Sequence, residues 1–166
     1  MKSKFIMRVI SSMLVFLIFA SALFLFVSCR QKISPYAMML EFCESYGIEN
    51  TVFSPVVSEG EAGYTDEDFF ETVFGEGIES VEDYAVVFLS SLDYVGECSL
   101  FLCYSDYDAL VVCNVLRRRV DLIKSVGAGI NTSYTADALI FKSGKYVVMC
   151  ALSDNILAER IWRKIL

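Results

Sequence analysis

The chain has 166 residues, of which 55% are hydrophobic, and its formal net charge at pH 7 is −7. This hydrophobic content excludes an intrinsically disordered protein, since the chain has enough apolar side chains to form a core. All 21 acidic residues follow Cys29, against 11 lysines and arginines, which gives that part a net charge of −10. A surface of this sign repels phosphate groups, so we expect no nucleic-acid partner.

The first 28 residues predict an export signal. Lys2, Lys4 and Arg8 precede an almost unbroken apolar run at 9–27, and the small residue Ser28 precedes Cys29. A cysteine in this position is typical of bacterial lipoproteins, in which the thiol accepts a diacylglycerol before the leader is cleaved. We therefore predict Cys29 as the lipidation site, and a lipid-anchored domain on the extracytoplasmic face of the cell membrane.

An uncleaved membrane anchor is the alternative interpretation of the leader. The run at 9–27 is 19 residues long, which approaches the ~20 residues of a transmembrane helix, and Phe26 is bulkier than the residue usually found three positions before a lipidated cysteine. The basic residues before the run favour a cytoplasmic N-terminus in either case. The expected organisation is a signal peptide or anchor helix at 1–28, a short tether at 29–34 and a single α+β domain at 35–166.

Two short helices are expected in the first part of the domain. Pro35 occupies a first helical position, and the helix that it begins is predicted to end near Gly47. Residues 49–64 predict a loop with at most one short extended piece at 51–57. Thr65 is the predicted N-cap of the second helix, whose first turn is acidic, as the positive end of the helix dipole favours.

Two strand-like segments follow, at 84–90 and 98–104, and their order predicts a hairpin joined across 91–97. Both segments are apolar on both faces, which places them centrally in a sheet covered on at least one side. Asp106 is the predicted N-cap of a long amphipathic helix that extends to about Val126.

The last segments predict a second hairpin and a final helix. Strands at 136–141 and 146–152 flank a tight turn in which Gly144 allows a positive φ. Asp154, or Ser153 before it, is the expected cap of the final helix. The order from Tyr84 is therefore ββαββα, which predicts a four-stranded, mainly antiparallel sheet with helices on one face.

Few patterns in the chain indicate catalysis. It has no histidine, which removes the commonest general base and metal ligand, and no serine lies in a Gly-x-Ser-x-Gly motif. Gly127 and Gly129 follow a helix rather than a strand, so they do not form a phosphate-binding loop. We expect no enzymatic activity, no catalytic residue, no cofactor and no metal site.

Charge is distributed unevenly along the chain. No lysine or arginine lies between Ser34 and Leu116, where 17 acidic residues fall, whereas nine basic and four acidic residues follow from Arg117. The two parts are expected to complement each other within one fold. The alternative is an acidic face that binds a cationic partner or divalent ions.

Two charged clusters within these halves were weighed as sites. The acidic cluster Asp66, Glu67, Asp68 and Glu71 lacks the spacing of a calcium-binding loop, which favours helix capping. The three arginines at 117–119 fan around a helix, and Asp121, four positions after Arg117 and three after Arg118, is placed for local ion pairs with these two.

Five cysteines follow Cys29, namely Cys43, Cys98, Cys103, Cys113 and Cys150. An odd number leaves at least one unpaired within a monomer, and there is no Cys-x-x-Cys motif. Cys98 and Cys103 are five apart in a predicted strand and should point to opposite faces. We expect buried free thiols that act as small hydrophobic residues. No resolving partner is visible, which argues against a redox role.

The chain resembles the small uncharacterised lipoproteins of Gram-positive bacteria that form the domain-of-unknown-function 4358 family. The resemblance rests on the Cys29 leader, the Tyr-Thr-Asp-Glu-Asp-Phe-Phe segment at 64–70, the Val-Glu-Asp-Tyr-Ala segment at 81–85, the helix at Asp106, and the hairpin at 142–146 with Ser153-Asp154 after it. It implies the same location and fold, and it supplies no recognised catalytic residues.

These features together predict a membrane-tethered, non-catalytic binding or assembly module, with an envelope protein as a possible partner. Two alternatives remain. One is an ion- or ligand-binding lipoprotein that uses the acidic half between Ser34 and Leu116, and the other is a thiol-dependent enzyme.

Overall fold

The computed structural model describes residues 33–91, 94–126 and 137–166. The predicted leader, the lipidation site Cys29 and most of the tether lie outside these residues. Four α-helices are described: α2 (Pro35–Tyr46), α3 (Glu67–Phe74), α4 (Asp106–Val126) and α6 (Asn155–Ile165), with one 3-10 turn, η1 (Ile78–Ser80). The strands are β1 (Val52–Phe53), β2 (Val81–Ser91), β3 (Tyr94–Cys103), β4 (Leu139–Ser143) and β5 (Tyr146–Ala151).

The strands form one antiparallel sheet in the order β1-β2-β3-β5-β4. The α+β class, the two hairpins and the ββαββα order from β2 onward are confirmed. The prediction of four strands is wrong, because β1 adds a fifth by pairing Val52 and Phe53 with the edge of β2. A strand of two residues is too short to produce an alternating pattern, so its sequence looks like part of a loop.

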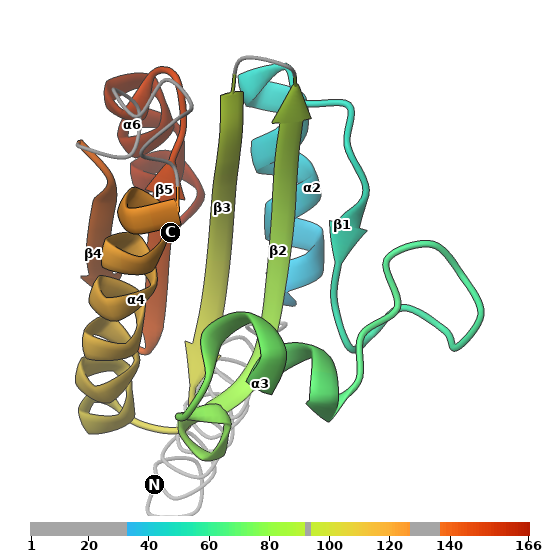
Figure 1. Ribbon diagram of the computed structural model, residues 1–166, viewed down its shortest axis with the longest axis vertical. Coiled ribbons are helices and arrows are strands. Elements are labelled where there is room, and N and C mark those ends of the chain that lie inside the picture. The colour runs from blue at the N-terminus through green and yellow to red at the C-terminus, as the bar shows by residue number, and fades with distance from the viewer. Residues whose placement is uncertain (1–32, 92–93, 127–136) are drawn as a thin grey trace, which may run out of the picture. The chain divides into compact units, whose positions relative to one another are not determined.

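Helices cover both faces of the sheet, whereas the sequence predicted helices on one face. Figure 1 shows α2 on one side of β2 and β3, with α3 and α4 on the other. Residues of α2 and α6 share a core with Cys98 and Leu100, and residues of α3 and α4 share a second core with Phe101 and Cys103. The prediction of helices on one face is therefore wrong. β2 and β3 are apolar on both faces, so both faces of the sheet must be covered.

Several helix ends agree with the sequence. Pro35 begins α2, the Ser34 hydroxyl accepts the Ala37 N–H at 3.3 Å, and Gly47 ends the helix at a φ of 81°. The Asp154 side chain accepts the Leu157 N–H at 2.8 Å, which confirms one of the two caps proposed for α6. Within the described ranges, none of the helices is long and apolar enough to cross a membrane.

Two predicted caps are each displaced by one residue. The cap of α3 is Asp66, which accepts the Phe69 N–H at 2.8 Å, while the hydroxyl of Thr65 accepts a hydrogen bond from the Tyr84 hydroxyl. At α4, Ser105 accepts the N–H of Asp108 at 3.1 Å, and the predicted cap Asp106 begins the helix. At the start of each helix, two adjacent residues are both good N-caps, namely Thr65 and Asp66 at α3 and Ser105 and Asp106 at α4. The local sequence does not show which of the two acts as the cap.

Candidate functional site

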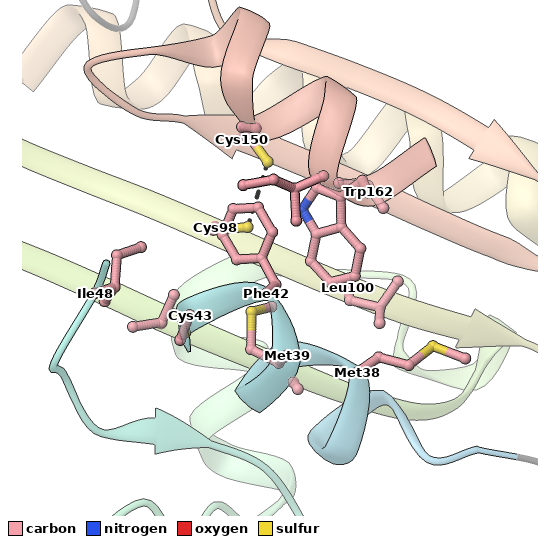
Figure 2. Packing of buried hydrophobic residues seen from close by; sticks show 14 of the residues in the cluster. Met38, Met39, Phe42, Cys43, Ile48, Cys98, Leu100, Cys150 and Trp162 are labelled. Atoms are coloured by element: carbon pink, nitrogen blue, oxygen red, sulfur yellow. Dashed lines mark hydrogen bonds between the residues drawn. The ribbon is translucent and has the colours of Figure 1, made fainter. Parts of the chain in front are cut away.

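Three thiols lie in the core beneath α2 and α6. Cys43 comes from α2, Cys98 from β3 and Cys150 from β5, and all three are buried (Figure 2). Cys98 and Cys150 are directly opposite each other in the register of the two strands. Their sulfur atoms are 3.3 Å apart, and neither residue has any solvent-exposed surface. The fold therefore places side by side two thiols that are far apart in the sequence.

Aromatic rings cover this thiol pair. Trp162 from α6 stacks on Phe42 from α2, with ring centroids 4.6 Å apart and an interplanar angle of 8°. The Trp162 indole nitrogen has no hydrogen-bond partner, and Figure 2 shows it on the side of the ring near the sulfur atoms. Burial raises the pKa of the Cys98 thiol well above its ordinary value, and the neighbouring Cys150 thiol raises it further.

Burial also affects three of the other thiols. It raises the pKa of Cys43 to about 11 and that of Cys103 to about 12, and it raises the pKa of Cys113. Cys103 and Cys113 lie in the opposite core, which confirms that Cys98 and Cys103 face opposite sides of the sheet. All five cysteines are buried, as the sequence predicted, and this structure contains them as thiols. Because the thiolate is the nucleophile, these surroundings disfavour thiol catalysis.

A buried ion pair lies on the α4 side of β3. Glu97 is 3% exposed, and its Oε2 accepts hydrogen bonds from Arg119 Nη2 at 2.8 Å and Nε at 3.1 Å. Its other oxygen, Oε1, has no hydrogen-bond partner, and neither does the buried hydroxyl of Ser99 two positions along the strand. Burial raises the pKa of Glu97, and the Arg119 charge opposes this shift in part.

The arginines therefore differ from their predicted roles. Arg119 reaches across to the sheet, where it also lies over the Phe74 ring at 5.9 Å, and Arg117 donates to Asn114 at 2.7 Å. Among the described residues, no ion pair joins Asp121 to Arg117 or Arg118, so the predicted local pairs are not present. A single acidic residue within an apolar strand, Glu97, was the signal in the sequence that a basic residue would lie opposite it.

This pair gives a first prediction, a pH dependence of stability. A carboxyl group whose pKa is raised on folding holds its proton more tightly in the native state, so stability falls as pH rises from about the ordinary value of 4.5 through the raised value. We expect the wild type to lose stability relative to Glu97→Gln as the pH increases over this interval. Urea unfolding of both proteins from pH 4 to pH 8 measures this difference, and a constant difference would contradict the prediction.

Of the acidic cluster at 66–71, Asp66 is the N-cap of α3 and accepts the Phe69 N–H at 2.8 Å, in agreement with the capping interpretation. Asp66 also lines a surface hollow of about 200 Å³ together with Glu82 and Asp83, and Asp83 accepts the Tyr84 N–H at 2.8 Å. In the part of the chain that the structure describes, no group of three or more His, Cys, Asp or Glu side chains is placed to hold a metal ion.

An exposed apolar surface surrounds the beginning of α4. It consists of Tyr104, Tyr107 and Leu110, which we call the tyrosine surface, and their exposed fractions are 56%, 74% and 55%. Tyr107 and Leu110 are three residues apart in the helix and so share a face. Tyrosine is enriched in protein interfaces, because its ring buries a large area and its hydroxyl can still form hydrogen bonds.

In comparisons with known proteins, no family model, curated protein or solved structure matches the chain. The function is therefore inferred from the sequence and from the geometry of the site.

Proposed function

We propose that this chain is a lipoprotein anchored through Cys29, and that its domain is a non-catalytic binding or assembly module for another envelope protein. The anchor is supported by the basic residues, the apolar run and the small residue that precede Cys29. Two acyl chains on one cysteine suffice for lasting attachment to a bilayer. The resemblance to small Gram-positive lipoproteins agrees with this location.

The observation that carries the binding role is the tyrosine surface. Tyr104, Tyr107 and Leu110 are each more than half exposed, and they fall within seven positions of the chain at the start of α4. A protein partner would remove them from water and provide acceptors for the two tyrosine hydroxyls.

The alternatives have less support. An ion-binding function would use the acidic hollow, but two of its carboxylates already accept backbone N–H groups. A thiol-dependent enzyme would need an accessible thiolate, whereas the thiols are buried and burial raises the pKa of four of them.

In a test of the proposal, a photo-crosslinking amino acid replaces Tyr107 in intact cells. We expect it to capture a discrete protein partner, since Tyr107 is the most exposed residue of the surface. The matched control places the same amino acid at Ile156 on α6, whose exposed fraction of 75% is close to the 74% of Tyr107. Equal capture at both positions would contradict a specific surface.

The same experiment in a Cys29→Ala background tests the anchor. The crosslinked product should be lost, and fatty-acid labelling of the chain should disappear with it. If the leader is instead an uncleaved helix, the variant keeps its membrane attachment and its partner, and no label is found in either form. A soluble protein that begins with the unmodified first methionine would overturn the proposed location.

A further inference from the structure

We infer that Cys98 and Cys150 are a disulfide modification site, in which a cross-strand bond between β3 and β5 forms while the domain folds. The site goes beyond the proposed binding role and stands on the geometry of the sheet. The proposed extracytoplasmic location enters only as the source of an external disulfide that serves as the oxidant.

The backbone already has the separation that such a bond needs. Cys98 and Cys150 are direct partners in the antiparallel register. Opposite residues in antiparallel strands have Cα atoms about 4.5 or 5.5 Å apart, and disulfides occur at Cα separations of about 4.4–6.8 Å. The sulfur atoms, 3.3 Å apart, must approach to about 2.05 Å. Rotation of the two side chains can supply that movement without displacing either strand.

The fold also selects this pair among the five thiols. Cys103 and Cys113 lie in the core on the other side of the sheet, so the strands separate them from Cys98. Cys43 belongs to the same core as the pair, but it comes from α2 and has no partner fixed by a strand register. One disulfide and three remaining thiols is therefore the expected oxidised state of the domain.

The chemistry is two successive thiol–disulfide exchanges. The thiolate of one cysteine attacks a sulfur of the external disulfide, which forms a mixed disulfide and releases one thiolate. The second cysteine then attacks the protein sulfur of that bond, which closes the cross-strand disulfide and releases the second thiolate. The released thiolates take up the two protons that the cysteines lose, so two cysteine thiols are oxidised and one disulfide is reduced to two thiols.

Burial sets the time at which this reaction occurs. Both cysteines are fully covered by the strands, α2 and α6, so an external disulfide cannot reach them in the folded domain. The thiol–disulfide exchange must take place before α6 packs over the sheet. Once α6 has packed, it shields the two sulfur atoms from further exchange, whether they are reduced or joined in a disulfide. The redox state is therefore fixed during folding.

The test uses the full-length chain in detergent with Cys29→Ala, which leaves the five thiols of the domain. The protein is unfolded in urea and refolded with oxidised and reduced glutathione, and then free thiols are alkylated and the peptides are identified by mass spectrometry. We expect a Cys98–Cys150 crosslinked peptide, three alkylated cysteines, and a melting temperature about 10 °C above that of protein refolded under reducing conditions. The native reduced protein should react with the same glutathione mixture far more slowly.

Two variants serve as controls. Cys103→Ala, also fully buried in β3, should retain the crosslinked peptide, and Cys98→Ala should lose it together with the thermal shift. The inference is overturned if Cys98 pairs mainly with Cys43, if no crosslink forms on refolding, or if the crosslink lowers the melting temperature. The peptide analysis of the parent chain decides the question even if a variant fails to fold, and its result does not depend on the location or partner of the protein.

Discussion

Replacing Arg119 by methionine is expected to lower the free energy of unfolding by about 3–5 kcal/mol at pH 7. Arg119 is the charged partner of Glu97, which is 3% exposed and has a second oxygen without any hydrogen bond. Without the guanidinium, this carboxylate is left buried and uncompensated. Methionine keeps most of the apolar stem of Arg119, so the effect is dominated by the loss of the guanidinium, which pairs with Glu97 and lies over the Phe74 ring.

The dependence on pH identifies the cause of this loss. At pH 4 the cost of Arg119→Met should be smaller, because a protonated Glu97 needs no counter-ion. The double variant Glu97→Gln with Arg119→Met should recover much of the stability, because no buried charge remains. Arg117→Met, on an exposed neighbour in the same helix, should change stability by less than about 0.5 kcal/mol. Urea unfolding of the four proteins measures these values, and equal losses for Arg117→Met and Arg119→Met would refute the role of the pair.

The second large effect is expected at Trp162. Its replacement by alanine should lower the free energy of unfolding by about 3–5 kcal/mol, the range for deletion of a large aromatic side chain from a core. Trp162 is fully buried and stacks on Phe42, so its removal opens a cavity between α6 and α2 beside the thiol pair. Thermal or urea unfolding provides the measurement.

Ile156→Ala is the matched control, because Ile156 lies on the same helix and is 75% exposed. It should change stability by less than about 0.5 kcal/mol. A further signature follows from the position of the cavity: when both proteins are refolded under reducing conditions, Cys98 and Cys150 should be alkylated faster in Trp162→Ala than in the wild type. Unchanged alkylation rates would show that Trp162 does not limit access to these thiols.

Local patterns predicted much of this fold. The Pro35 start, the Gly47 end and the Gly144 turn depend on the backbone preferences of single residues, so they can be recognised without knowledge of the tertiary structure. The apolar character of the two long strands indicated a central place in the sheet. Strands that are apolar on both faces also need helices on both sides of the sheet, as the two cores show. The prediction of helices on one face did not take this into account.

The features that the sequence did not reveal depend on long-range register. Cys98 and Cys150 are 52 positions apart, and no local spacing indicates that β5 inserts beside β3. The same holds for Glu97 and Arg119, which become partners only when α4 packs on the sheet.

The strand order has a consequence for folding. β3 receives its second neighbour only when Tyr146–Ala151 is available, so a chain synthesised from its N-terminus holds a long apolar strand with one open edge until that segment has been made. Such an edge readily recruits strands from other molecules. A version truncated before Tyr146 should therefore aggregate rather than persist as a smaller folded unit.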